Sequence, residues 1–333
     1  MVYLTKTNKG VRLSLTLTAI VLFSVCAAFA LNTFVGYQTQ KKSLTDNTLE
    51  MNSITAKELS RTTQTMIESM QETMKTAAQF FSSAELGSDN AIRQLDFLRN
   101  TVPYFNSVAI ADANGVIRST SPSTLHLVGE KLNSAQAQQA LQTKKPLISE
   151  PYRAITGRLI VMVSHPIYDP DGEYRGFIAG TIYLQEENVF QKILGNQSKN
   201  RSGSYFYVVD AKGNLLYHPD RERLGENVAS NPVVRELMNG KSGHMAVVNT
   251  KNVPFIAGFS LVAKVGWGIV SQTPQSYIAE SVQHLVTRMA ILSAPMLALL
   301  LALVIWFSLR LSAPLNRLAQ LASRYNRGEA IPV

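Results

Sequence analysis

The sequence predicts an α+β fold in which a long N-terminal helix precedes two tandem modules with antiparallel sheets, with a transmembrane helix on each side of this region. Three observations predict it. Two uncharged apolar runs lie near the ends of the 333-residue chain, and a polar run free of Gly and Pro follows the first of them. The segment between the apolar runs repeats one order of strand, turn, strand and helix, which indicates a tandem duplication.

The two apolar runs, residues 13–35 and residues 289–309, contain no charged side chain. At a rise of about 1.5 Å per residue, either helix crosses a hydrocarbon layer about 30 Å thick. Much of the net charge of +9 lies beside these runs, in the basic tail of residues 1–12 and in residues 310–333. Basic flanks mark the cytoplasmic side. We therefore expect a multi-pass protein of the cell (inner or plasma) membrane, with both termini in the cytoplasm and the central segment outside it.

This distribution of charge argues against nucleic-acid binding, because a basic stripe on the folded region itself is absent. A cleaved signal peptide is the alternative for the first run, since residues 28–30 (Ala-Phe-Ala) resemble a cleavage site and Lys6, Lys9 and Arg12 supply a basic leader. Signal peptides usually have an apolar core of about 7–15 residues, and this run is longer. We expect an uncleaved helix.

Metal and catalytic chemistry have little support in the central segment. The single cysteine, Cys26, lies in the first apolar run, so the exported part forms no disulfide, and the five histidines lack metal-ligand spacing. The motifs G-x-S-x-G, H-E-x-x-H and G-x-x-x-x-G-K-[ST] are absent. Ser164 and His165 are neighbours on a predicted strand, and such neighbours point to opposite faces. We expect no metal, no cofactor and no enzyme activity in this chain.

Residues 36–87 are predicted to form one long extracytoplasmic helix. Met66, Met70 and Met74 recur every four residues and form an apolar stripe, a pattern that predicts packing of one helix face. Because the helix continues from the first membrane run, we expect it to transmit movement. We also expect it to pair with a second copy of itself, giving a homodimer.

Short β-rich runs begin after Gly87. Residues 107–112 and 116–120 flank an Asn-Gly pair, which is a strong hairpin signal because both turn positions tolerate positive φ. Residues 158–169 and 174–184 flank a second turn and are predicted to form the central strands of an antiparallel sheet.

The same pattern then recurs. Asp112 and Gly115 have counterparts in Asp210 and Gly213, each 98 residues later, and in both copies a Gly-Glu pair and a short helix follow. Matching turns, strands and a helix in one order indicate two tandem α/β modules. Their predicted ranges are residues 88–200 and residues 201–280.

A long helix, two PAS-like modules and a membrane helix on each side resemble the double Cache family, the extracytoplasmic sensing domains of bacterial and archaeal receptors. The most specific features are the two Asp-x-x-Gly turns with their Gly-Glu continuations, together with residues 149–152, 156–158 and 166–169. The resemblance covers about residues 40–280. It implies that residues 88–200, here called the distal module, hold a ligand, and that residues 201–280, the proximal module, relay the signal.

Two departures from the family pattern concern the ligand. Many amino-acid-binding members have Arg, Trp and Tyr before the distal helix, where this chain has residues 133–138 (Asn-Ser-Ala-Gln-Ala-Gln), and an aspartate where this chain has Thr181. Amino-acid sensing is therefore not expected. A guanidinium group matches a carboxylate well, so the remaining polar residues favour a small organic anion. The candidate ligand-binding residues are Arg118, Tyr152, Arg153, Arg158, Ser164, His165 and Tyr183.

Residues 310–333 resemble the first helix of a HAMP relay, with Pro314 followed by Leu315, Leu318 and Leu321. The HAMP connector would begin at Gly328, so we expect either a truncated receptor or one that works through a partner. The predicted function is a transmembrane signal-transduction receptor for a small extracytoplasmic ligand. Any catalytic output domain would lie beyond residue 333, with a diguanylate cyclase slightly favoured over a histidine kinase or a chemoreceptor tail. The alternative is a membrane-anchored adaptor that binds a protein partner through the same domain.

Overall fold

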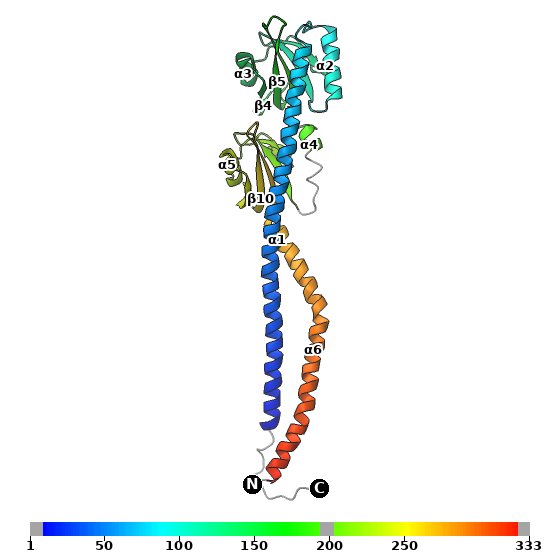
Figure 1. Ribbon diagram of the computed structural model, residues 1–333, viewed down its shortest axis with the longest axis vertical. Coiled ribbons are helices and arrows are strands. Elements are labelled where there is room, and N and C mark those ends of the chain that lie inside the picture. Colours follow the sequence, from blue (N-terminus) through cyan, green and yellow to red (C-terminus); the bar gives the residue numbers. More distant parts are fainter. Residues whose placement is uncertain (1–8, 194–202, 326–333) are drawn as a thin grey trace. The chain divides into compact units, whose positions relative to one another are not determined.

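The computed structural model describes residues 9–193 and 203–325. It confirms the predicted α+β class, with a long N-terminal helix and two antiparallel sheets (Figure 1). The chain divides into two units. One comprises the ends of the chain, up to Thr45 and from Ile278 onward, and the other is Asp46–Tyr277.

Two helices enter the first unit, α1 (Lys9–Phe80) and α6 (Gln275–Tyr325). Each contains a stretch long and apolar enough to cross a membrane, and the side chains of these stretches are not buried inside the protein. A hydrogen bond between the hydroxyls of Thr18 and Ser308 joins the two helices. Apolar helix surfaces without protein cover are stable in lipid, so both helices are candidate transmembrane helices, as predicted.

The helix bounds differ from the predicted ones. Helix α1 passes without a break through the membrane run and the predicted long helix, and it ends at Phe80, before residue 87. Helix α6 passes through residues 289–309 and continues to Tyr325. Gly328 lies outside the described residues, and a HAMP module stays a prediction.

Helix α2 (Asp89–Thr101) opens the distal module and is absent from the sequence prediction. Its N-terminus is capped by Ser88, whose hydroxyl accepts from the backbone N–H of Ala91 at 3.2 Å. Ala91 and Leu95, one helical turn apart, are buried. The capping serine and this spacing are the signal in the sequence for the helix.

The distal sheet has the order β2-β1-β6-β5-β3, with β4 also paired to β5, and every pairing is antiparallel. The central positions of β5 and β6 confirm the prediction for residues 158–169 and 174–184. The elements after α2 are β1 (Ser107–Asp112), β2 (Ile117–Ser121), η1 (Ser123–Leu125), α3 (Ala135–Thr143), β3 (Leu147–Ile148), β4 (Tyr152–Arg153), β5 (Leu159–Tyr168), β6 (Tyr174–Tyr183) and α4 (Val189–Ile193).

The proximal sheet has the order β8-β7-β11-β10-β9. Each strand occupies the place of its counterpart in the distal sheet, so the predicted repeat is a structural repeat. The proximal elements are β7 (Tyr205–Val209), β8 (Leu215–Tyr217), η3 (Arg221–Arg223), α5 (Pro232–Met238), β9 (Gly243–Val248), β10 (Pro254–Val262) and β11 (Trp267–Pro274).

The repeated turn has the same hydrogen bonds in both modules. Asp112 Oδ1 accepts from the N–H groups two and four residues later at 2.9 and 3.0 Å, and Asp210 Oδ1 does so at 2.9 and 2.8 Å. Gly115 and Gly213 have φ of +81° and +83°, which a side chain disfavours. Asn114 does not share this positive φ, so the aspartate, and not a second left-handed residue, completes the turn.

One hydrophobic core connects α1 with both modules. The methionine stripe packs as predicted, with Met66, Met70 and Met74 at most 4% exposed, and it shares a core with residues of both sheets. Phe190 of the distal module packs against Trp267 of the proximal one, with ring centroids 5.9 Å apart. The two modules are therefore packed against the same helix and against each other.

Helix α1 also lies directly on the proximal sheet. Asn52 Nδ2 donates to the carbonyl of Ile256 on β10 at 2.9 Å. A Cβ atom on Gly258 would lie 2.1 Å from the backbone nitrogen of Ser53. Only glycine permits this approach of strand and helix.

Candidate functional site

A cavity of about 280 Å³ lies on one face of the distal sheet. Along β1, Ser107, Ala109 and Ala111 line the cavity, whereas Val108 and Ile110 alternate with them and belong to the core shared with α1. Helices α3 and α2 lie on opposite sides of this sheet (Figure 1). The cavity is on the side of α3, whose buried alanines pack with residues of β5 and β6.

Small side chains on the sheet create this cavity. In the β1–β6 register, Ser107 lies opposite Thr181 and Ala109 opposite Ala179, and all four line the cavity. These four residues form what is here called the floor of the cavity, and their small side chains leave the space above the sheet unfilled. Residues 131–134 and residues 152–156, which begin with strand β4, cover the space from the other side.

The polar groups on the floor are uncharged. Ser107 Oγ and Thr181 Oγ1 are 2.5 Å apart. Thr120 is buried, and its hydroxyl has no hydrogen-bond partner among the described residues. The Tyr152 hydroxyl approaches the Met162 sulfur at 3.7 Å, and burial raises the pKa of this phenol. The phenol therefore stays protonated and able to donate.

The charged groups of the lining are both basic and exposed. They are Lys131 and Arg153, and Arg153 Nη1 donates to the carbonyl of Gly157 at 3.0 Å. Among the described residues that line the cavity there is no Asp or Glu. The site thus offers an apolar interior, neutral hydroxyls on the floor and positive charge at the covering loops.

The structure places three of the predicted site residues, Tyr152, Arg153 and Tyr183, in the cavity lining. Their contact with a ligand stays a prediction. Arg158 stacks on the Tyr183 ring at 4.9 Å but pairs with Glu186 at 2.5 Å, and it is not part of the lining.

The other three predicted residues also lie outside the lining. Arg118 pairs with Asp112, with Nη2 to Oδ2 at 2.6 Å, and this arginine and two backbone N–H groups together lower the pKa of the carboxyl despite its partial burial. Ser164 is buried further along β5. His165 is on the opposite face of that strand, because residues at odd positions of β5 belong to the core with α1.

Sequence reasoning misses Thr120 and Lys131 as residues of the cavity. Lys131 follows the Gly-Glu pair that serves as a family feature, so it is visible as part of a motif. Thr120 carries no signal of its own, because its position depends on the pairing of β2 with β1, where it lies opposite Ala109.

The proximal module has a pocket in the corresponding place, but its volume is only about 20 Å³. Tyr205 lies opposite Gln272 in the β7–β11 register, as Ser107 lies opposite Thr181 in the distal sheet. Tyr207 corresponds to Ala109. These larger side chains, together with those of the following loop, fill the space that is open in the distal module.

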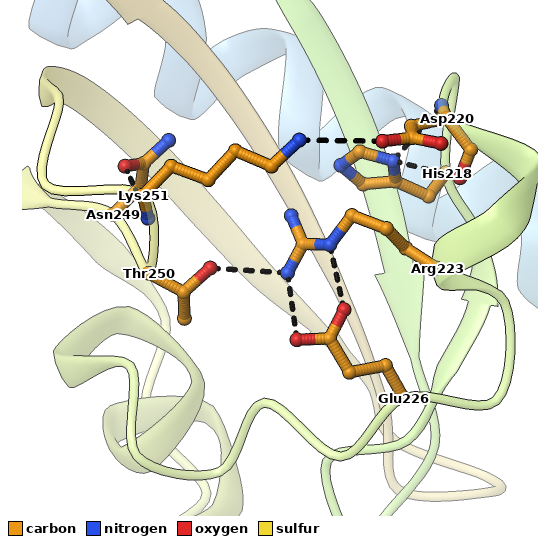
Figure 2. Close-up of polar contacts among 7 residues, drawn as sticks. All are labelled: His218, Asp220, Arg223, Glu226, Asn249, Thr250 and Lys251. Carbon is orange, nitrogen blue, oxygen red and sulfur yellow. Dashed lines mark hydrogen bonds and ion pairs between the residues drawn. The ribbon is translucent and has the colours of Figure 1, made fainter.

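Ion pairs close the loops over the proximal pocket (Figure 2). Arg223 donates to both carboxylate oxygens of Glu226, at 2.6 and 3.1 Å, and to Thr250 Oγ1 at 3.0 Å. Lys251 pairs with Asp220 at 3.3 Å. These contacts join the loop after β8 to the β9–β10 hairpin.

The protonation states fit a closed pocket. Arg223 lowers the pKa of Glu226, and Lys251 lowers the pKa of Asp220. Burial lowers the pKa of His218, and its Nδ1 accepts from the N–H of Asp220 at 3.0 Å. At neutral pH His218 is uncharged, and both carboxylates are ionised and paired.

A larger groove of about 420 Å³ lies between α1 and α2. Its most prominent side chains, Phe80 and Phe97, are 51% and 68% exposed. Because it is an open surface between two helices, it encloses a small molecule less well than the distal cavity does.

The Cache domain family model matches residues 36–282. An extracellular ligand binding receptor from Desulfohalobium retbaense DSM5692 is 18% identical with a TM-score of 0.56, and the match covers 66% of this chain and 39% of that chain. The extracellular domain of the putative histidine kinase rpHK1S-Z16 is 15% identical with a TM-score of 0.59, over 69% of this chain and 98% of that chain.

The ligand binding domain of the Pseudomonas aeruginosa PAO1 amino acid chemoreceptor PctB, in complex with L-Gln, is 18% identical with a TM-score of 0.50, over 73% of this chain and 98% of that chain. At these identities the structural likeness supports the fold alone. No curated protein sequence matches the chain.

Proposed function

The chain belongs to the Cache domain family, and on this premise we propose that it is a transmembrane receptor whose distal module binds a small organic anion. The observation that carries the proposal is the chemistry of the distal cavity. Its interior is apolar, and its two charged lining side chains, Lys131 and Arg153, are basic. A carboxylate beside Arg153, with an apolar body in the cavity, matches this distribution.

Among the related proteins, PctB binds L-Gln, so an amino acid is the ligand class to compare. An amino acid brings an ammonium group as well as a carboxylate. Thr181 stands where many amino-acid-binding family members have the aspartate that pairs with this ammonium, and the described lining contains no carboxylate. An unpaired buried ammonium is costly, which favours an anion without a positive group.

We further propose that both termini lie in the cytoplasm, because the basic flanks of residues 1–12 and 310–333 border the apolar runs. Helix α1 is continuous from the shared core into its apolar stretch, and this continuity supports its role in relaying the signal. Relay requires a ligand with different affinity for two states of the domain. The domain itself senses, and a diguanylate cyclase, a histidine kinase or a chemoreceptor tail would supply the output.

Titration calorimetry of the full chain in nanodiscs with a panel of small organic acids tests the ligand class. We expect at least one acid to bind, and Arg153→Ala to weaken that binding about tenfold through loss of a charged hydrogen bond. Arg93→Ala is the matched control, because Arg93 is an exposed arginine of the same module outside the lining. If no acid in the panel binds, or if Arg153→Ala leaves the affinity unchanged, the proposal fails.

A membrane-anchored adaptor is the second candidate function, and the exposed Phe80 and Phe97 of the groove between α1 and α2 favour it. Co-purification of a partner that is lost in Phe97→Ser, without any thermal shift by small molecules, would support it. Pairing of two copies along α1 also stays a prediction, which light scattering of the detergent-solubilised chain tests.

A further inference from the structure

We propose that the ligand carries, besides its carboxylate, an uncharged oxygen at its inner end, and that Thr120 is the residue that selects for it. The ligand class is then a short oxo or hydroxy acid, with its carbonyl or hydroxyl remote from the carboxylate. This inference rests on the proposed function, because it places the carboxylate beside Arg153.

Thr120 is the least satisfied polar group of the cavity. It lines the cavity and is 2% exposed, and its hydroxyl has no hydrogen-bond partner among the described residues. Buried hydroxyls are normally hydrogen-bonded. Rotation about χ1 moves the threonine hydroxyl between staggered positions, so it can turn toward a bound group without movement of the backbone.

The surroundings of Thr120 select for a neutral partner. Thr120 lies opposite Ala109 on β1, two residues from Ser107, whose hydroxyl is 2.5 Å from that of Thr181. No charged side chain belongs to these floor positions, so a second carboxylate there would lack a counter-ion. A carbonyl or hydroxyl oxygen needs only a hydrogen bond, and Thr120 supplies one.

The charged and neutral groups come from different layers of the site. Lys131, in the loop before α3, and Arg153, at the end of the short edge strand β4, are exposed, whereas Thr120 on β2 is buried. A ligand that reaches both layers has its carboxylate at the loops and its neutral oxygen on the floor. A simple fatty acid of the same length leaves Thr120 without a partner.

A matched pair of five-carbon acids tests this arrangement: 4-oxopentanoate and pentanoate differ by one carbonyl oxygen. Calorimetry of the full chain in nanodiscs is expected to show about tenfold tighter binding of 4-oxopentanoate, the effect of about one net hydrogen bond. Thr120→Val keeps the shape and removes the hydroxyl, and it is expected to abolish the preference for 4-oxopentanoate over pentanoate. Thr120→Ser keeps the hydroxyl and is expected to retain the preference.

The outcomes separate this inference from the proposed function. If wild type binds both acids equally, or if Thr120→Val keeps the preference, the role of Thr120 is wrong and the anion receptor stands. If neither acid nor any other organic acid of the panel binds, both proposals are overturned. Thermal unfolding checks that Thr120→Val folds, which we expect because the change removes an unpaired buried hydroxyl, and Thr120→Ser provides the same test with a smaller change.

Discussion

The distal and proximal modules have the same sheet order and the same aspartate-glycine turn, yet among the described residues the corresponding sheet face holds a cavity of ligand size in the distal module and a nearly filled pocket in the proximal one. The volumes are about 280 Å³ and about 20 Å³. Ser107 and Ala109 on the distal floor are replaced by Tyr205 and Tyr207 on the proximal floor. Duplication of a fold therefore does not duplicate a site, because the volumes of a few side chains on one sheet face decide whether the space is open.

The segments that cover the two sheets also differ, in whether their arginine is already paired with a carboxylate. In the proximal module Arg223 is held by Glu226 through two hydrogen bonds, so its charge is already compensated. In the distal module Arg153 donates only to a backbone carbonyl among the described residues. The distal loops therefore offer a cation to a ligand, whereas the proximal loops are closed by their own ion pairs.

The largest expected effect is the loss of stability on removing a large side chain from the proximal sheet face. Tyr207→Ala removes a ring that is 5% exposed, and we expect the free energy of unfolding to fall by about 3–5 kcal/mol, as for other large buried aromatics. Chemical denaturation of the full chain in detergent measures this. The chain has two tryptophans, and in a Trp306→Phe background the fluorescence of Trp267, a proximal-module residue in the core shared with α1, reports on unfolding.

Tyr207→Phe is the matched control for this prediction. The Tyr207 hydroxyl has no partner among the described residues, so its removal is expected to leave stability unchanged or slightly higher. A large loss of stability in Tyr207→Phe would mean that the hydroxyl, and not the ring volume, holds the pocket closed.

Filling the distal floor is the reverse change and the next largest effect. Ala109→Tyr copies Tyr207 into the distal module, and we expect it to weaken binding of the organic acid by at least about 100-fold, because a cavity site depends on enclosed volume. Calorimetry measures the affinity, and thermal unfolding checks the fold. The exposed Ala113→Tyr serves as control, and an unchanged affinity in Ala109→Tyr would place the ligand elsewhere.

The smallest expected effect is a pH dependence of stability that arises in the proximal module, at His218. Burial lowers the pKa of His218 below its usual value of 6.5, and the positive charges of Arg223 and Lys251 lower it further. Asp220 raises this pKa but does not cancel the shift. The unfolded state therefore binds a proton that the folded state resists, and proximal stability falls as the pH decreases through 6.5. Trp267 fluorescence during thermal unfolding at pH 7.5 and 5.5 measures the change.

His218→Gln is expected to flatten this pH dependence. The carboxylates of Asp220 and Glu226 have lowered pKa values, so they lose their stabilising charge only below pH 4.5 and do not contribute in this range. A pH dependence that persists unchanged in His218→Gln would assign it to another group.

Prediction from sequence succeeds where the signal is local. Asp112 and Gly115 encode their turn within a few residues, and the recurrence of that turn 98 residues later is enough to indicate the second module. The methionine stripe of α1 likewise encodes its buried face through its own spacing. Helix α2 is missed although its signal is also local, in the capping residue Ser88 and the spacing of Ala91 and Leu95.

The candidate site is less predictable. Tyr152 and Arg153 are identified through their place in a family-like segment, and both line the cavity. His165 belongs to the same stretch of sequence, but the alternation of β5 places it on the other face. Arg118 and Arg158 have carboxylate partners that are 6 and 28 residues away along the chain, and no local sequence pattern predicts these ion pairs.

By itself, the sequence determined the two apolar helices, the tandem repeat and the α+β class, because each depends on residue patterns along a contiguous stretch of chain. Only the tertiary structure decided which module is open. That outcome depends on strand register, which sets Ala109 opposite Ala179 and Tyr205 opposite Gln272. Whether opposed side chains fill a space depends on their summed volume across strands distant in sequence, and no local pattern records it.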